Sequence, residues 1–294
     1  MFDDFKNAFQ RHNNAHVQLI IINIIVFVVL GVILVFSKAL QYGDIFDFIY
    51  NQIAIPSPIS LFLQKPWTLI TYAFAHSYER LMHIVFNMLG LYWFGKLFVE
   101  YLGSDKLIAL YLLGALSGAT AYLLAYNTIP YFMESNNASM VGASAAVFAI
   151  VVATATLLPD YTFFLLLIGP VKIKYIAAIY VFASFLATIG DNAGGNIAHL
   201  GGALIGFVYL KQLQAGSNWG NWITLTLQWF KNLFKAKPAV KVTYRKNETY
   251  VSKPSKSSKV SQEELDAILD KISDGGYESL TKEEKEKLFN ASKK

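Results

Sequence analysis

Long stretches without a charged side chain place this chain in a membrane. Val17–Phe36, Leu107–Tyr126 and Met140–Leu158 each run for 19 or 20 residues with no Asp, Glu, Lys or Arg. A helix of about 20 apolar residues crosses the hydrocarbon core of a bilayer. Only 15% of the 294 residues are charged, well below the roughly 25% of an average soluble protein. We therefore expect an all-α membrane protein.

Three further segments are close to the length of a span but carry polar groups. They are about Met82–Phe98, Lys174–Gly190 and Ile197–Leu210. Unpaired polar groups inside a bilayer cost several kcal/mol, so those retained in a span indicate helix contacts or a functional site. Together with the three charge-free stretches, these segments predict a bundle of six transmembrane helices with a short helical tail.

The predicted spans divide the chain into four parts. These are an N-terminal cytoplasmic segment (1–16), the six-helix membrane domain (17–214), an interfacial helix with a basic linker (215–260) and a helical hairpin (261–294). No small-residue cleavage site follows the first span, so we expect that helix to be retained.

The segment after the last span is predicted to lie at the membrane surface. Trp219–Phe234 is too short and too polar to span a bilayer, and its aromatic ends are typical of an interfacial helix. Ala236–Val260 is rich in Lys, Ser and Pro, which predicts a flexible linker.

The last 34 residues contain two helix start signals. The pairs Ser261–Glu264 and Thr281–Glu284 are capping boxes on either side of Gly275-Gly276, which predicts a helical hairpin. We expect its apolar stripe to dock on a partner or on the membrane domain. The stripe consists of Leu265, Ile268, Leu269 and Ile272.

The distribution of basic residues predicts the orientation of the spans. Placing the N-terminus inside collects most Lys and Arg on the cytoplasmic side and leaves only Lys38, Lys65 and Arg80 outside. Both termini are then cytoplasmic, and the second, fourth and sixth helices enter from the outer face. The basic residues on the cytoplasmic side are Lys6, Arg11, Lys106, Lys172, Lys174 and the tail residues Lys231, Lys235, Lys237, Lys241, Arg245 and Lys246.

This orientation brings four polar residues to a similar depth. Ser144 is predicted roughly 6 Å below the start of the fourth helix, at 1.5 Å per residue. His199 then lies in the first turn of the sixth helix, and His83 and Asn87 lie in the first turns of the second. A serine needs a base within hydrogen-bond reach to act as a nucleophile, and histidine is the usual partner.

Small residues allow the fourth and sixth helices to approach closely. Gly202 and Gly206 have the Gly-x-x-x-Gly spacing, and alanines surround Ser144. Phe148 lies one turn after Ser144 and either belongs to the core or stacks on His199. We expect Phe148 and Gly202 to support a Ser144–His199 pair.

His83 and Asn87 are spaced i, i+4, so both project from one face of their helix. Their N–H groups, together with the backbone N–H of Ser144, are candidates for stabilising an oxyanion. Each side chain alone is equally suited to an interhelical hydrogen bond.

Other protease chemistries lack their residues. The sequence has no His-Glu-x-x-His motif, no cysteine, no pair of intramembrane aspartates, and Val147 instead of Lys three residues after Ser144. No acidic residue is placed to orient His199, so a Ser/His dyad is expected rather than a triad. No metal, cofactor or nucleic acid is expected.

Several motifs resemble those of the rhomboid family of intramembrane serine proteases. The resemblance covers about Pro58–Leu210, and its pieces occur in the family's order. They are Pro66-Trp67, Phe74-Ala75-His76, His83-x-x-x-Asn87 with Met88-Leu89-Gly90, Gly103-Ser104, Gly142-Ala143-Ser144-Ala145, and Ala198-His199-Leu200-Gly201-Gly202-x-x-x-Gly206.

The resemblance implies a six-helix core with a Ser144–His199 dyad that water reaches from the outer face. His83 and Asn87 would help to form the oxyanion hole. The expected protein is a multi-pass serine endopeptidase of the cell membrane. Its partners would be the lipid bilayer and membrane-protein substrates, cut in or near their transmembrane segments.

Three positions depart from the family pattern. Ala145 stands where the family usually has Gly, Thr68 where it often has Arg, and the separation of His76 and His83 is longer than usual. The methyl group of Ala145 is expected beside the oxyanion site. An inactive rhomboid-fold protein that binds or routes membrane clients is therefore the alternative. A small-solute transporter is less favoured, because helix discontinuities and paired repeats are not evident.

Overall fold

The computed structural model describes residues 8–9, 13–134, 137–165, 168–233 and 261–292. The chain divides into two compact units, residues 1–235 and 236–294. Most of the predicted N-terminal segment and the linker predicted over Ala236–Val260 lie outside the described residues.

The first unit is a helical bundle, in which each of the six predicted spans contains a helix. Four helices are long and apolar enough to cross a membrane, and two apolar helices are shorter. The long ones are α2 (Ala15–Ala39), α6 (Leu81–Leu102), α7 (Ser104–Thr128) and α11 (Ala193–Gln214), and the short ones are α9 (Ser144–Leu157) and α10 (Ile173–Leu186), which continues as η2 (Ala187–Ile189).

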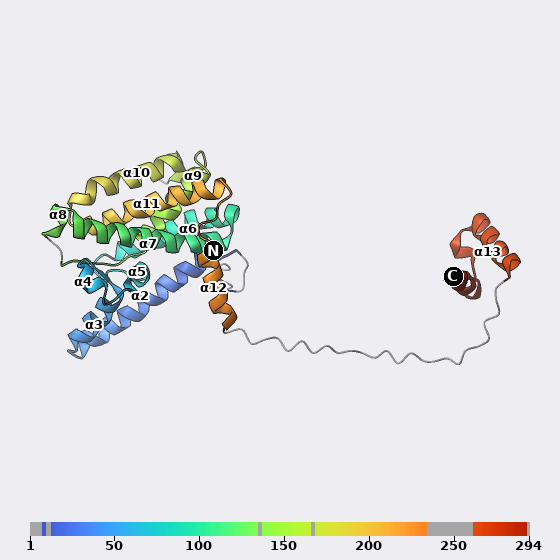
Figure 1. Ribbon diagram of the computed structural model, residues 1–294, viewed down its shortest axis with the longest axis horizontal. Coiled ribbons are helices and arrows are strands. Elements are labelled where there is room, and N and C mark those ends of the chain that lie inside the picture. Colours follow the sequence, from blue (N-terminus) through green and yellow to red (C-terminus); the bar gives the residue numbers. More distant parts are fainter. Residues whose placement is uncertain (1–7, 10–12, 135–136, 166–167, 234–260, 293–294) are drawn as a thin grey trace. The chain divides into compact units, whose positions relative to one another are not determined.

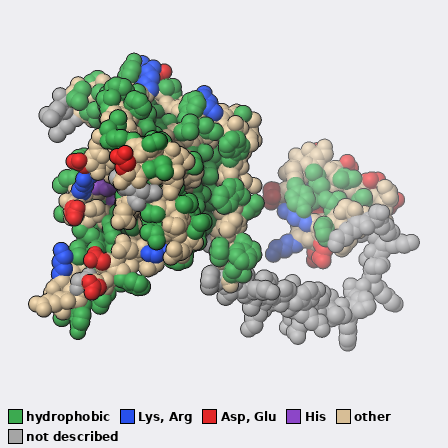
Figure 2. All heavy atoms as spheres, turned by 60° about the vertical axis from the view of Figure 1, so that its left-hand side comes forward, with side chains coloured by type: hydrophobic (Ala, Val, Ile, Leu, Met, Phe, Trp, Pro, Cys, Tyr) green, Lys and Arg blue, Asp and Glu red, His purple; other side chains and the backbone are tan. Residues whose placement is uncertain are grey.

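The short helix α9 packs against both α11 and α7, which also contact each other, with α6 against it as well. Helix α10 runs along one edge of the bundle (Figure 1). Most residues of α9 are buried, whereas α2 and α10 expose many large apolar side chains. Figure 2 shows hydrophobic side chains over much of the bundle's surface. This distribution is typical of a bundle surrounded by lipid.

Glycines on both neighbours allow α9 to pack closely. A β-carbon at Gly202 of α11 would lie 2.0 Å from the carbonyl oxygen of Ala145, so the backbones meet with no room for a side chain. Gly206 stands in the same relation to Ala149, at 2.3 Å. The close approach predicted from Gly202-x-x-x-Gly206 is confirmed. A second pair with this spacing, Gly114 and Gly118, lies on α7.

Two predicted helix starts are wrong. The fourth helix begins at Ser144 and not at Met140. Met140 belongs to a short strand, and Gly142 has a φ of +140°, which an α-helix does not accommodate. Ser144 is therefore the first residue of α9 and does not lie about 6 Å below the helix start, as predicted.

The sixth helix begins at Ala193, before the predicted Ile197, which puts His199 in its second turn. Gly194 packs against the ring of Tyr122, where a β-carbon would lie 2.6 Å from Cε2. This contact holds the Gly-rich start of α11 on α7, where the sequence alone suggested a loop.

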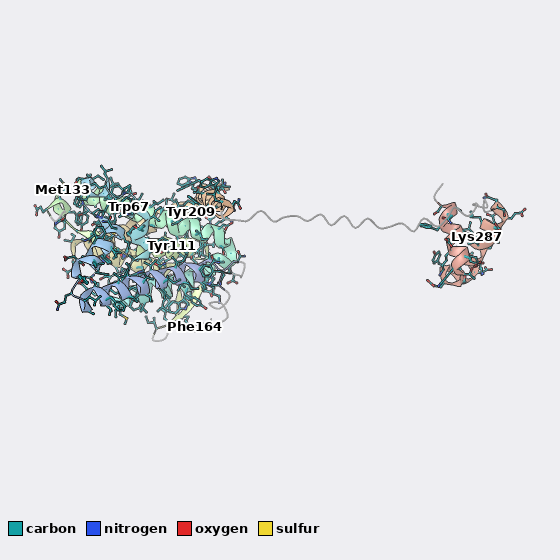
Figure 3. All side chains as sticks on the ribbon, turned by 90° about the horizontal axis from the view of Figure 1, so that it is seen from below. Trp67, Tyr111, Met133, Phe164, Tyr209 and Lys287 are labelled. Atoms are coloured by element: carbon teal, nitrogen blue, oxygen red, sulfur yellow. The ribbon has the colours of Figure 1, made fainter. Side chains whose placement is uncertain are left out.

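The loop between α2 and α6 forms short helices. They are α3 (Gly43–Ile53), α4 (Ile59–Phe62), α5 (Thr68–Thr71) and η1 (Tyr72–Phe74). The Tyr72 hydroxyl donates to the Ala115 carbonyl at 2.7 Å, and the Tyr111 hydroxyl donates to the Ala73 carbonyl at 2.7 Å. Tyr111 lies in the middle of the bundle in Figure 3. These bonds fix the end of the loop on α7.

Two pairs of short strands complete the connections. β1 (Ile55–Pro56) pairs antiparallel with β2 (Ser139–Met140), which follows the short α8 (Pro130–Met133). β3 (Thr162–Leu165) and β4 (Gly169–Lys172) form a hairpin in which Thr162 pairs with Lys172. The chain thus reverses its direction before α10.

The remaining helices also follow the sequence pattern. α12 (Asn221–Leu233) is the short helix with aromatic ends. The second unit contains α13 (Gln262–Gly275), η3 (Tyr277–Ser279) and α14 (Lys282–Ala291). Both predicted capping boxes are formed, at Ser261 and at Thr281, and Gly276 ends α13 with a φ of +71°. Docking of its apolar stripe stays a prediction.

Candidate active site

Ser144 is held at the start of α9 by contacts of the residues that precede it. Met140 pairs with Ile55 in the two-stranded sheet, and the Gly142 N–H donates to the Tyr72 carbonyl at 2.9 Å. Ser144 is buried, with 8% of its surface exposed. As the first residue of α9, it lies at the positive end of the helix, where the first N–H groups have no partner within the helix.

The ring of His83 and the hydroxyl of Ser144 both lie beside Gly142. A β-carbon at Gly142 would be 2.8 Å from His83 Cε1 and 3.5 Å from Ser144 Oγ. The φ of +140° also excludes most other residues from this position. Gly142 thus leaves the space in which these two side chains, from α6 and α9, come together.

Two contacts hold the ring of His199. Its ring stacks on Phe148 with a centroid separation of 4.2 Å and an interplanar angle of 11°, the stacked arrangement considered from the sequence. Its Nδ1 lies 3.0 Å from Ser184 Oγ on α10. Its Nε2 is buried and has no hydrogen-bond partner among the described residues. Phe148 is one turn after Ser144 in α9, so the His199 ring of α11 packs beside the start of α9.

Asn87 and His83 lie one turn apart on α6, as their spacing predicted. The Asn87 amide Nδ2 is 3.2 Å from His76 Nε2, and the His76 and His83 rings are 5.7 Å apart at 67°. Asn87 is buried and His76 is fully buried. The structure therefore adds His76 to the predicted group.

Burial, with a smaller contribution from the neighbouring His83, lowers the pKa of His76 to about 3. The ring is neutral at ordinary pH. Because an amide nitrogen only donates, Nε2 accepts the bond and Nδ1 carries the proton. The motif Phe74-Ala75-His76 singled out this residue in the sequence, but did not indicate its contact with Asn87.

Ser184 is a second residue that the sequence analysis missed. It is the only serine or threonine in α10, within a run of apolar and aromatic residues. A lone hydroxyl in an apolar span is a signal for an interhelical contact. Its partner depends on the rotation of α10 about its axis, which the sequence pattern does not determine.

The methyl group of Ala145 does not point where the sequence suggested. It lies against α7, so close that a β-carbon at Gly118 would be only 2.5 Å from it. Ala145 is 1% exposed, and its methyl fills the space that Gly118 leaves open. The expected methyl beside the oxyanion site is therefore a packing contact between α9 and α7.

A cavity of about 1340 Å³ extends from His83 across the loops at this end of the bundle. Met140 and Val141, just before Ser144, line it. Much of its remaining wall is aromatic, from Phe46, Tyr50, Tyr78, Phe86, Tyr122, Tyr126, Tyr131 and Phe132. Figure 2 shows histidine among acidic and basic side chains on one face of the bundle. The cavity thus reaches His83 and the segment that precedes Ser144, but neither Ser144 nor His199 is among its lining residues.

No metal centre is evident in the part of the chain that the structure describes, where no three His, Asp or Glu side chains gather suitably for an ion. The chemistry available at this place rests on a serine hydroxyl, histidine rings, an amide and a helix N-terminus.

Comparison with known proteins supports the resemblance. Residues 63–214 match the rhomboid domain, and residues 255–294 match a family of unknown function (DUF6576). RHOMBOID-like protein 12, mitochondrial, from Arabidopsis thaliana is 35% identical over 159 residues, which cover 51% of this chain and 47% of that protein. The chain thus spans about half the length of this curated relative.

The matched domain contains Ser144, His199, His83 and Asn87, and it covers just over half of the chain. Because the sequence of this domain matches together with its membrane helices, the chain belongs to the rhomboid family.

Proposed function

We propose that this protein is an intramembrane serine endopeptidase that cleaves membrane proteins in or near their transmembrane segments. One observation carries the proposal. The buried Nε2 of His199 has no partner among the described residues, and its ring is stacked one turn below Ser144, at the start of the adjacent helix. A free imidazole nitrogen beside a buried hydroxyl is the arrangement that a Ser/His dyad requires.

The reaction follows from these two side chains. Ser144 Oγ attacks the scissile carbonyl carbon while His199 Nε2 takes the hydroxyl proton. His199 then gives this proton to the leaving amine, and the C–N bond breaks to leave an ester on Ser144. Water attacks the ester with His199 again as the base, and the proton returns to Ser144 Oγ. The Ser144–His199 hydrogen bond forms when substrate is bound.

We assign the stabilisation of the oxyanion to His83, Asn87 and the backbone N–H of Ser144. The closeness of His83 to Ser144 around Gly142 supports this assignment. The positive end of α9 adds a favourable field for the negative charge that develops there. Phe148 and Gly202 support the dyad, the first by stacking and the second by close helix packing.

The proposed membrane domain has six spans, including α9 and α10. α9 contains 14 residues and is roughly 21 Å long, against a hydrocarbon core of about 30 Å. If α9 ends at the inner boundary, Ser144 lies about a third of the way into the core. The cavity beside His83 would supply water to it from the outer face.

The distribution of Lys and Arg supports an orientation with both termini in the cytoplasm and the site open to the outer face of the cell membrane. We also propose that the chain is organised into the four parts predicted from the sequence, and that the C-terminal hairpin binds a partner. Substrates would enter as extended chains, because a helical peptide bond is shielded by its own turn.

The alternative function, binding of membrane clients without catalysis, has less support. The sequence favoured this alternative because Ala145 was expected to place a methyl beside the oxyanion site. In the structure that methyl lies against Gly118 of α7. Both dyad residues are present, and the contacts of His199 are those of an oriented base.

The test is cleavage of a model transmembrane substrate by the reconstituted protein, with labelling by a serine-directed fluorophosphonate. We expect the wild type to cleave and to be labelled, and Ser144→Ala and His199→Ala to do neither. Ser117→Ala is the matched control, because Ser117 donates a hydrogen bond to the Gly201 carbonyl of α11 at 2.8 Å and lies outside the dyad. An unlabelled, inactive wild type would refute the protease function.

A further inference from the structure

The catalytic base of the proposed dyad has a second polar partner on a different helix. Ser184 Oγ lies 3.0 Å from His199 Nδ1, the ring nitrogen opposite to the one that would serve Ser144. In serine proteases generally, the group that bonds Nδ1 selects the ring orientation that presents Nε2 to the nucleophile. A carboxylate usually fills this position, and here a serine hydroxyl occupies it.

The burial of Ser184 is unusual for its helix. Within α10, which is described throughout, only Ile173, Ala177 and Ser184 are buried. Its neighbours Phe182 and Phe185 are exposed apolar residues suited to lipid. The Ser184 hydroxyl is therefore directed inward from an otherwise lipid-facing turn, and its hydrogen-bond partner is the His199 ring.

A second side chain of α10 points to the same place. Tyr180, one turn before Ser184, meets the ring of Phe148 edge-on at 5.9 Å and 70°. Phe148 in turn stacks on His199. One face of α10 thus contacts both the imidazole edge and the aromatic ring behind it, so the helix restrains the imidazole in position and in rotation.

We propose that Ser184 is a positioning residue that orients His199 and accepts a hydrogen bond from its Nδ1–H during catalysis. When His199 takes the proton from Ser144 Oγ, the imidazolium has two N–H donors, and Ser184 Oγ accepts from the one at Nδ1. The Nδ1 proton stays on the ring throughout. This inference rests on the proposed protease function, and it assigns the third member of a Ser144–His199–Ser184 arrangement.

The test compares steady-state cleavage of a reconstituted model transmembrane substrate by three variants. We expect Ser184→Ala to lower kcat roughly tenfold, the loss typical of one hydrogen bond to a charged group, with KM unchanged. Ser184→Thr keeps the hydroxyl and should restore kcat to within about twofold of the wild type. Ser117→Ala removes a hydroxyl bonded to the α11 backbone and should keep the wild-type kcat.

The outcomes separate this inference from the protease function. Wild-type kcat in Ser184→Ala would contradict the positioning role while cleavage by the wild type still supports the protease. Equal losses in Ser184→Ala and Ser117→Ala, or a change in KM alone, would assign Ser184 to helix packing and overturn the inference. An inactive, unlabelled wild type would refute the protease function, and this inference with it.

Discussion

The Asn87 amide donates to the His76 imidazole over 3.2 Å, and both side chains are buried. This bond crosses from α6 to the end of the first loop. The oxyanion role proposed for Asn87 requires its amide N–H groups to point in fixed directions. His76 fixes one of them and leaves the second N–H of the amide for the substrate.

Replacement of His76 should therefore reduce catalysis through Asn87. We expect His76→Ala to lower kcat/KM by roughly tenfold, because the Asn87 amide loses the partner that orients it. His76→Gln retains an acceptor and should lose less. The measurement is cleavage of the model substrate, with fluorophosphonate labelling to count active sites. Equal activity of His76→Ala and the wild type would show that the bond has no catalytic role.

The lowered pKa of His76 predicts that the stability of the protein depends on pH. The pKa of His76 is about 3 in the folded protein, against an ordinary value of about 6.5. Between these values the unfolded chain binds a proton that the folded chain does not. The contribution to stability is therefore complete above about pH 6.5 and is lost progressively as the pH falls toward 3.

Unfolding in detergent at about pH 7.5 and about pH 5 measures this effect. The wild type should lose more stability than His76→Gln over this interval, because glutamine does not titrate. His83 and His199 remain in both proteins, so their contributions cancel in the comparison. The same loss in both proteins would count against the buried neutral state of His76.

Local sequence signals predicted much of this fold. The capping boxes at Ser261 and Thr281, for example, each join residues three apart. The candidate site residues also came from the sequence, because Ser144 and His199 each lie in a recognisable motif. In each case the sequence signal lies within a few consecutive residues.

Several features set by distant contacts were not predicted. The start of α9 at Ser144 depends on the pairing of Met140 with Ile55, 85 residues away. The partner of Ser184 and the direction of the Ala145 methyl depend on how α10 and α9 are rotated about their axes. Rotation is decided by packing against neighbours, and an almost uniformly apolar helix gives no periodic signal for it.

Ala145 offers a direct test of such a rotation. Ala145→Gly introduces the residue that is usual in the family. If the Ala145 methyl lay beside the oxyanion site, its removal would raise the activity. The structure predicts instead that kcat changes by less than about twofold and that stability falls by about 1–2 kcal/mol. The loss arises because the change empties space against Gly118 and adds backbone freedom at the start of α9. A large gain in kcat at unchanged stability would contradict this placement of the methyl.

The close contact between α11 and α9 predicts a strong effect of one added methyl group. A β-carbon at Gly202 would lie 2.0 Å from the Ala145 carbonyl oxygen. This oxygen belongs to the backbone, so it cannot move aside as the end of a flexible side chain can. We expect Gly202→Ala to push the helices apart, to lower stability by about 1–3 kcal/mol and to abolish cleavage, because Phe148 and His199 lose their alignment.

Gly190→Ala is the matched control for this change. Its added β-carbon would have its nearest contact at 3.5 Å, from the Ala187 carbonyl oxygen, which is ordinary van der Waals contact. Gly190 has an extended backbone that alanine also adopts. This variant should therefore keep wild-type stability and cleavage. Thermal unfolding in detergent and cleavage in proteoliposomes measure both proteins. Retention of full activity by Gly202→Ala would show that α9 and α11 tolerate a wider separation, and that the dyad does not depend on this contact.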